Sequence, residues 1–317
     1  MITLKNVCKN YGPIQAVANV SFSIPKGEIV GFVGPNGAGK STTMKIITTY
    51  TAPSSGTVTV GGFDVVENAL EVRELIGYLP ETTPLYADML VHEYLEFVGR
   101  ARHLNGAFKS RFDWVVEAAG LGTVLRRKIG ELSKGFRQRT CLAQALIHDP
   151  AVLILDEPTS GLDPLQIIGI RKLIKELAHE KTIILSTHIL SEAAAVSDRI
   201  LMIHNGRIAA DGKFEDLVRR VSDQNSVYIA VRAPKKDFDS SVRSMDLKDI
   251  IYDEALPRGV VGAHLFSEAK VDLTGKLNEL IREKKWDIFN FTPEQMSLED
   301  TFIRLTSGDK NSQGGDA

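Results

Sequence analysis

The segment Glu131–Pro164, ELSKGFRQRTCLAQALIHDPAVLILDEPTSGLDP, indicates the fold class more clearly than any other part of the chain. Within it, the apolar run Val152–Leu155 is followed at once by Asp156 and Glu157. A short, wholly apolar run is typical of a central strand that is buried on both faces of a parallel sheet. Two carboxylates directly after such a strand are costly to desolvate unless a cation or a proton compensates them. We therefore expect this strand end to carry chemistry rather than to form a solvated acidic turn.

A glycine-rich loop lies upstream of this strand. Residues 34–42, GPNGAGKST, fit the pattern G-x-x-x-x-G-K-[S/T] and lie between an apolar run at 28–33 and a helical-looking segment at 42–47. A strand, a glycine turn and a helix in this order indicate a phosphate-binding P-loop rather than a chance match. The residues expected to bind the nucleotide here are Gly34, Pro35, Asn36, Gly37, Ala38, Gly39, Lys40, Ser41 and Thr42.

The two motifs together predict a nucleotide hydrolysis centre. Backbone N–H groups of the loop and the positive end of the following helix would surround the phosphates. Lys40 should reach the β- and γ-phosphates, and the Ser41 hydroxyl should bind Mg²⁺. Ligands of doubly wound α/β sheets bind at the carboxyl ends of the strands, which would bring Asp156 near the same phosphates as a Mg²⁺ ligand. Glu157 could then orient or deprotonate the attacking water.

In this order the motifs resemble those of the nucleotide-binding subunit of an ABC transporter, over roughly residues 1–220. Residues 132–136, LSKGF, resemble the family signature, usually LSGGQ, which many P-loop proteins lack. Without the other motifs, the same residues would be read as an ordinary helix start with a serine cap. The resemblance implies an α/β fold: a RecA-like P-loop core, an antiparallel β subdomain and a helical subdomain at about residues 82–147.

The resemblance also implies that the site is shared between two chains. In the family, two cassettes pack head to tail, so that Ser133 and Gly135 would contact the γ-phosphate bound by the partner. Asp163 would lie in the loop that couples the two sites. His188 matches the family's switch histidine at the γ-phosphate, although a lone histidine after a strand is more often structural. Tyr11 stands where the family stacks an aromatic ring on adenine, although it could equally be core.

The chain departs from the family pattern in two places. Glu81 follows residues 76–80 where the family has a glutamine, and Lys134-Gly135-Phe136 replaces Gly-Gly-Gln. Glu81 keeps an oxygen for the metal and adds negative charge near the two acids, so we expect it to remain a ligand on the metal side. Lys134 could face the partner's phosphates or solvent. Both departures resemble exporter ATPases, including those associated with bacterial gliding motility, and so favour an exporter.

Composition agrees with this interpretation. The 317 residues, 43% of them hydrophobic, are enough for one large α/β domain and a small one. A formal net charge of −2 argues against a nucleic-acid partner. Two cysteines without a C-x-x-C pattern fit a reducing compartment and make zinc improbable. No apolar run approaches about 18 residues and the amino terminus lacks a signal peptide pattern, so we expect a cytoplasmic chain, peripheral on the inner face of the membrane.

These expectations define the partners and cofactors. ATP and Mg²⁺ would be the cofactors, and an integral membrane permease and a second cassette, most simply an identical chain, would be the partners. Residues 82–96 are the candidate segment facing the permease. The runner-up function is a non-transport ABC ATPase, although cassettes of translation factors come in pairs and those of chromosome ATPases need a long coiled coil that residues 81–130 cannot supply.

The carboxyl-terminal third has a different pattern. Residues 221–306 read as strand, weak helix, strand, strand, helix and strand, which suggests a ferredoxin-like α+β domain. Ser297–Asp300 matches a capping box that would begin a final helix ending near Thr306. Residues 307–317, rich in glycine and polar residues, are expected to be disordered. Two interpretations of this domain stay open. It could regulate the chain or support dimerisation, or it could be a passive appendage.

Overall fold

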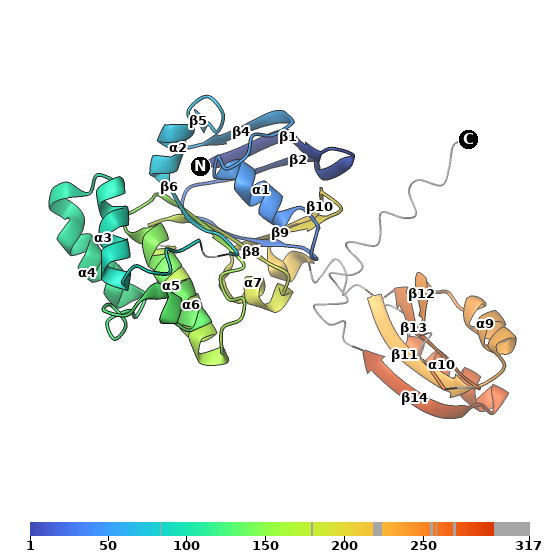
Figure 1. Ribbon diagram of the computed structural model, residues 1–317. Helices are drawn as coiled ribbons and strands as arrows, with labels where there is room; N and C mark the ends of the chain where they lie inside the picture. The colour runs from blue at the N-terminus through green and yellow to red at the C-terminus, as the bar shows by residue number, and fades with distance from the viewer. Residues whose placement is uncertain are drawn as a thin grey trace. The chain divides into compact units, whose positions relative to one another are not determined.

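The chain folds into two compact units. The computed structural model describes residues 1–82, 84–178, 180–217, 224–253, 256–257, 259–268 and 271–294. The units comprise Met1–Phe214 and Glu215–Ala317 (Figure 1). The division thus lies at residue 214, whereas the sequence suggested a boundary near residue 220.

A six-stranded sheet forms the centre of the larger unit. Its strand order is β10-β9-β3-β8-β7-β6, and every neighbouring pair except β9 with β10 is parallel. The strands are β3 (Ile29–Val33), β6 (Ile76–Leu79), β7 (Val152–Asp156), β8 (Thr182–Thr187), β9 (Arg199–His204) and β10 (Arg207–Gly212). This arrangement confirms the predicted parallel α/β core.

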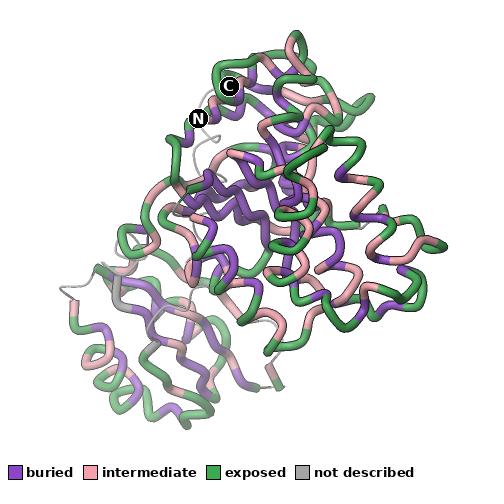
Figure 2. Tube along the Cα trace, turned by 90° about the vertical axis from the view of Figure 1, so that its left-hand side faces the viewer, coloured by how far each residue is buried: buried purple, intermediate pink, exposed green. Residues whose placement is uncertain are grey.

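The two faces of this sheet enter separate hydrophobic cores. In β7, Leu153 and Leu155 pack into one core, while Val152 and Ile154 pack into the other. Figure 2 shows these buried strands at the centre of the larger unit. Covering on both faces explains why the strand reads as a continuous apolar run rather than as an alternating one.

A second sheet and one helix cover the face of the central sheet that carries Val152 and Ile154. The antiparallel order is β2-β1-β4-β5, formed by β1 (Ile2–Tyr11), β2 (Ile14–Ile24), β4 (Ser55–Val60) and β5 (Phe63–Asp64). Helix α1 (Lys40–Ile47) packs into the same core, and α2 (Ala69–Leu75) leads into β6. The alternating segments at 2–7 and 20–24 are parts of β1 and β2, which confirms the predicted antiparallel subdomain.

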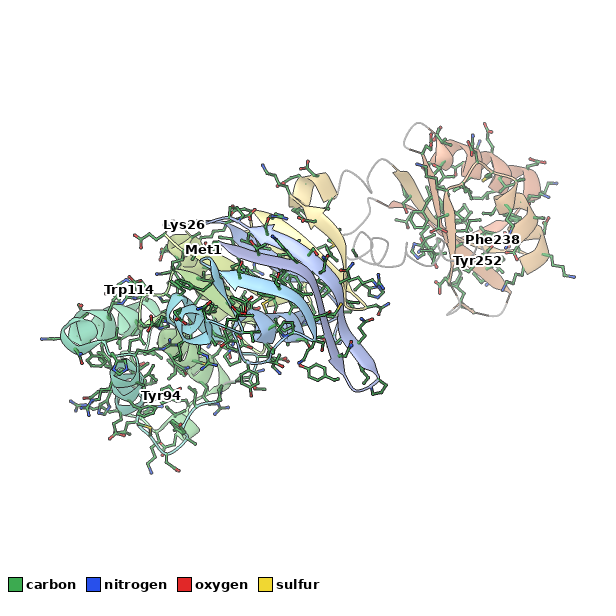
Figure 3. The ribbon with its side chains drawn as sticks, turned by 90° about the horizontal axis from the view of Figure 1, so that it is seen from above. Met1, Lys26, Tyr94, Trp114, Phe238 and Tyr252 are labelled. Carbon is green, nitrogen blue, oxygen red and sulfur yellow. The ribbon has the colours of Figure 1, made fainter. Side chains whose placement is uncertain are left out.

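Helices cover the other face. They are α3 (Val91–Ala101), α4 (Phe108–Ala118), α5 (Lys134–Leu146), α6 (Pro164–Leu177) and α7 (Leu190–Val196), with short 3-10 turns at Asn105–Ala107 and Ile129–Glu131. Helix α3 begins where Glu93 accepts the backbone N–H of Leu90 at 2.9 Å. Tyr94 on α3 and Trp114 on α4 lie in this helical region (Figure 3). Within the described residues, no helix has the length and apolar character needed to cross a bilayer.

The smaller unit has the predicted ferredoxin-like order. Its elements are β11 (Gln224–Arg232), α9 (Lys235–Arg243), β12 (Asp249–Tyr252), β13 (Val260–Glu268), α10 (Leu273–Lys284) and β14 (Asp287–Glu294). The strands form an antiparallel sheet of order β12-β13-β11-β14. Phe238 of α9 and Leu277 of α10 join Ile229 of β11 in one core. The predicted helix at 297–306 and the tail at 307–317 lie outside the described residues.

One half-buried histidine, His148, links the end of α5 to the sheet. The Nε2 atom of His148 lies 3.0 Å from the carbonyl oxygen of Ile76, while Nδ1 has no hydrogen-bond partner among the described residues. Burial, reinforced by the nearby Arg102 cation, lowers the pKa of His148 to about 4. The neutral ring therefore donates from Nε2, and a proton on Nδ1 would be buried without an acceptor.

This pKa predicts a loss of stability in mild acid. Because the folded-state pKa lies below the ordinary histidine pKa of 6.5, the unfolded chain takes up the proton first. The contribution of His148 is fully present above pH 6.5 and is lost as the pH falls toward 4, by on the order of 3 kcal/mol. Urea unfolding at pH 7 and pH 4.5 should show a smaller pH dependence for His148→Gln, which keeps an N–H donor. An unchanged dependence would contradict this assignment.

Candidate functional site

Four parallel strands end at one cavity of about 470 Å³. The glycine-rich loop follows β3, Glu81 lies just beyond β6, Glu157 follows β7, and His188 follows β8. The lining includes nine residues predicted from the sequence: Asn36, Gly37, Gly39, Lys40, Ser41, Thr42, Glu81, Glu157 and His188. Ala16 and Ser160 complete the lining. The geometry therefore brings together segments that are more than a hundred residues apart in the chain.

The shape of the glycine-rich loop depends on its glycines. Gly37 and Gly39 have positive φ angles of 79° and 109°, which side chains disfavour. A Cβ atom on Gly39 would lie 2.5 Å from the carbonyl oxygen of Ala16, and one on Gly34 would lie 2.4 Å from that of Ile203. The loop is thus wedged against the backbones of β2 and β9.

The Lys40 side chain is held inside this loop. It is only 6% exposed, and Nζ donates hydrogen bonds to the carbonyl oxygens of Gly34 at 2.8 Å and Pro35 at 3.3 Å. The same Nζ lies 3.5 Å from Oε1 of Glu157. Two carbonyl dipoles and one carboxylate therefore compensate the buried ammonium, which meets the requirement that buried charges be paired.

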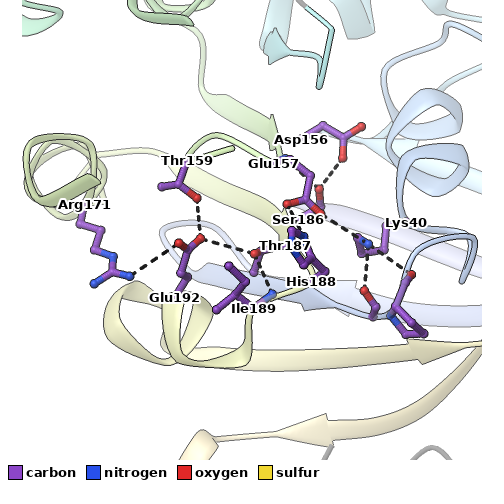
Figure 4. Close-up of polar contacts among 12 residues, drawn as sticks. Lys40, Asp156, Glu157, Thr159, Arg171, Ser186, Thr187, His188, Ile189 and Glu192 are labelled. Carbon is purple, nitrogen blue, oxygen red and sulfur yellow. Dashed lines mark hydrogen bonds and ion pairs between the residues drawn. The ribbon is translucent and has the colours of Figure 1, made fainter. Parts of the chain in front are cut away.

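The two acids at the end of β7, Asp156 and Glu157, make different contacts. Asp156 is 1% exposed, and its Oδ1 accepts a hydrogen bond from the Ser186 hydroxyl on β8. Glu157 has a φ of 50°, a left-handed conformation that is strained for a residue with a side chain. Its Oε2 lies 3.0 Å from Nδ1 of His188 (Figure 4). The left-handed backbone separates the two carboxylates and gives Glu157 two polar neighbours at the cavity, Lys40 and His188.

The residues expected to serve a second chain do not line this cavity. Ser133 is the N-cap of α5 and accepts the N–H of Phe136 at 3.3 Å, so the ordinary capping contact is present. Asp163 is likewise the N-cap of α6 and accepts the N–H of Gln166 at 2.9 Å. The phosphate contacts of Ser133, Gly135 and Asp163 thus remain predictions.

The signature segment and the loop before α6 interlock through two glycines. A Cβ atom on Gly135 would lie 2.4 Å from Oε1 of Gln166, and one on Gly161 would lie 2.1 Å from Nζ of Lys134. Gly161 also has a positive φ of 71°. The Lys134 side chain therefore lies across Gly161 of its own chain, a contact that the sequence alone did not indicate.

Tyr11 lies apart from the cavity lining. It ends β1, is 47% exposed, and its ring lies under Nζ of Lys9 at 5.1 Å from the ring centroid. Its predicted contact with adenine stays a prediction. Sequence reasoning missed Ser186, whose hydroxyl contacts Asp156, and Ser160, which lines the cavity. The Ser-Thr-His run after the apolar strand at 182–185 was the available signal for Ser186.

Comparisons with known proteins point in one direction. Residues 17–160 match the family model described as ABC transporter. The chain is 33% identical over 319 residues to the bacitracin transport ATP-binding protein BcrA of Bacillus licheniformis, a match that covers 97% of this chain and 98% of the relative. It is 39% identical over 213 residues to the Nod factor export ATP-binding protein I of Burkholderia lata, covering 67% of this chain and 70% of that protein.

A solved structure shows the same fold in a two-chain assembly. The dimeric structure of a bacterial ABC transporter cassette matches with a TM-score of 0.61 and 29% identity, over 67% of this chain and 98% of the cassette. The match with BcrA extends further, because it takes in nearly the whole chain and thus the smaller unit as well.

The wedged glycine gives a test of the loop geometry. Gly39→Ala should destabilise the larger unit more than Gly37→Ala, although both residues have positive φ. Each alanine carries the backbone cost of about 1–2 kcal/mol. Only the one at residue 39 meets a backbone oxygen, and overpacking adds about 1–3 kcal/mol. Urea unfolding of the two variants measures the difference, and equal losses would refute the wedged arrangement.

Proposed function

Because this chain belongs to the ATP-binding proteins of ABC transporters, we propose that it hydrolyses ATP at the cavity beyond β3, β6, β7 and β8 and so energises a separate membrane permease of an exporter. The observation that carries the proposal is the convergence of Lys40, Ser41, Glu157 and His188 on that one cavity. The runner-up, a non-transport ABC ATPase, would use the same chemistry with a different partner.

The glycine-rich loop and α1 supply the phosphate site. The N-terminus of α1 begins at Lys40, so the positive end of the helix dipole and the free N–H groups of its first turn lie at the cavity. Lys40 already occupies this position, paired with Glu157 and two carbonyl oxygens. A triphosphate would exchange these partners for phosphate oxygens, to which charge-assisted hydrogen bonds are strong.

The donor set fits Mg²⁺. Ser41 and Glu81 line the cavity, and Asp156 ends the adjacent strand, which offers one hydroxyl and two carboxylate oxygens of the hard type that Mg²⁺ prefers. In the part of the chain that the structure describes, no three histidine, cysteine or acidic side chains gather to hold a metal by themselves. That fits an ion bound together with phosphate oxygens. Bound there, Mg²⁺ would neutralise charge on the phosphates.

Glu157 is our candidate for the residue that activates water. Its buried carboxylate is held between the ammonium of Lys40 and the imidazole of His188. When water attacks the γ-phosphorus, a new phosphorus–oxygen bond forms and the bond to the β-phosphate oxygen breaks. Glu157 would accept the proton of the water, and His188 would hold the carboxylate in place while contacting the γ-phosphate.

We further propose that the working unit is a head-to-tail pair of these chains. Ser133 and Gly135 would then complete the site of the partner, and Asp163 would lie between the two sites. The dimeric cassette that resembles this chain supports the pairing. ATP binding would close the pair and hydrolysis would release it, so that association becomes part of the catalytic cycle.

A basic pocket supports the docking of a permease. It has a volume of about 380 Å³ and meets the predicted docking segment at Thr82 and Pro84. Lys45, Arg73 and Arg102 line it, and as far as the described residues form it the lining holds no carboxylate. We assign it to an acidic cytoplasmic segment of the permease, and docking there would hold the chain at the inner face of the membrane. The export function named for the Burkholderia relative supports the direction of transport.

Two substitutions separate binding from chemistry. Glu157→Gln should lower kcat by about 10²- to 10⁴-fold, because water activation is lost. ATP should bind this variant at least as tightly, since Lys40 no longer has an ion pair to give up. Lys40→Ala should weaken ATP binding by about 10- to 100-fold. Phosphate release and calorimetric titration measure these quantities; normal turnover by Glu157→Gln would exclude Glu157 as the base.

The permease partner can be tested by copurification in mild detergent. An untagged integral membrane protein should copurify with the tagged chain, and Lys45→Glu should reduce its yield by about tenfold or more because like charges then meet. Lys172→Glu reverses an exposed charge on α6, away from the pocket, and should retain the partner. Absence of any membrane partner from the wild-type chain would favour the non-transport ATPase.

A further inference from the structure

The carboxylate of Glu192 contacts three separate segments of the larger unit. It lies in the first turn of α7, with its side chain 11% exposed. Its Oε2 accepts a hydrogen bond from the Thr159 hydroxyl at 2.5 Å and lies 3.5 Å from the hydroxyl of Thr187. Its Oε1 lies 4.0 Å from Nη2 of Arg171 on α6 (Figure 4).

Two of these partners adjoin the residues that we assign to catalysis. Thr159 follows Glu157 by two positions, and Thr187 directly precedes His188. Glu192 therefore ties the chain beyond the end of β7 to the chain beyond the end of β8. Within the sheet, the backbone N–H of Glu157 already bonds to Ser186. The Glu192 contacts lie past that last sheet contact, where the two segments leave the sheet.

The hydroxyl of Thr187 transmits this contact to His188. Its oxygen accepts the backbone N–H of Ile189 at 3.0 Å and so closes a tight turn around His188. A hydroxyl has one hydrogen, and that of Thr187 is directed at Oε2 of Glu192, 3.5 Å away. The carboxylate thereby orients the hydroxyl, and the hydroxyl shapes the turn that places the imidazole 3.0 Å from Glu157.

We propose that Glu192 is a positioning residue for ATP hydrolysis, which holds the Glu157 and His188 segments in register through Thr159 and Thr187. The proposal rests on the hydrolytic role proposed above. Glu192 does not line the nucleotide cavity, so it acts on the water-activating pair without touching the phosphates. Arg171 extends the contact to α6, the helix that Asp163 caps.

Steady-state ATP hydrolysis by Glu192→Ala tests the proposal. We expect kcat to fall by about 10- to 100-fold, the effect of misplacing a catalytic group by about 1 Å. The KM for ATP should change by less than about twofold, because Lys40 and the glycine-rich loop are untouched. Glu176→Gln, which removes an exposed carboxylate of α6, is the matched control and should behave as wild type. An unchanged kcat overturns the proposal. A fall in kcat that is accompanied by a raised KM also overturns it.

Threonine variants keep the proposal testable if Glu192→Ala fails to fold. Thr187→Val should reproduce the loss of kcat, while Thr187→Ser, which keeps the hydroxyl, should restore turnover. The double variant Glu192→Ala/Thr187→Val should lose no more than either single variant, because both act through one contact. Additive losses, or equal activity of the valine and serine variants, would show a merely structural role. Inactive wild-type protein would instead overturn the proposed function itself.

Discussion

Burial of the central sheet on both faces is the constraint on which the rest of the larger unit depends. The antiparallel sheet and α1 cover one face, and the helices α3 to α6 cover the other, so that polar chemistry has no place along the strands. It is confined to the strand ends, where the chain leaves the sheet. The four parallel strands β3, β6, β7 and β8 deliver their next residues to the same edge, and the cavity forms there. Because β7 is buried on both faces, it appears in the sequence as a continuous apolar run.

The electrostatic design of the cavity follows from its depth. Lys40 and Glu157 are each about 6% exposed, and each is a partner for the other at 3.5 Å. The positive charge of Lys40 and the negative charge of Glu157 thus neutralise each other within the site. Under the proposed function, a triphosphate would replace an existing set of contacts, and the net gain on binding would be smaller than the new contacts alone suggest. The same contacts would hold the Lys40 side chain close to the proposed phosphate position before a nucleotide binds.

Local patterns predicted most of the fold and nine of the eleven residues that line the cavity. The glycine-rich loop, the apolar strand with its two acids, and the strand and helix order of the smaller unit are each written in fewer than fifteen consecutive residues or in simple periodicity. Glu192 could not be found in this way, because its partners Thr159 and Arg171 are 33 and 21 positions away and none of the three belongs to a recognisable motif. The contact between Lys134 and Gly161 is also hidden in the sequence, because the two residues are 27 positions apart. One helix start was also shifted, since α1 begins at Lys40, two residues before the helical-looking segment at 42–47.

The interlocked glycines have a consequence for how this sequence can change. A side chain at residue 161 would displace the end of the Lys134 side chain, and one at residue 135 would displace the end of the Gln166 side chain. Each pair shares one volume, which either member can fill and both cannot. A substitution at one member of either pair therefore requires its partner to move or to become shorter. At residue 161 the positive φ of 71° disfavours a side chain as well, whatever the length of residue 134.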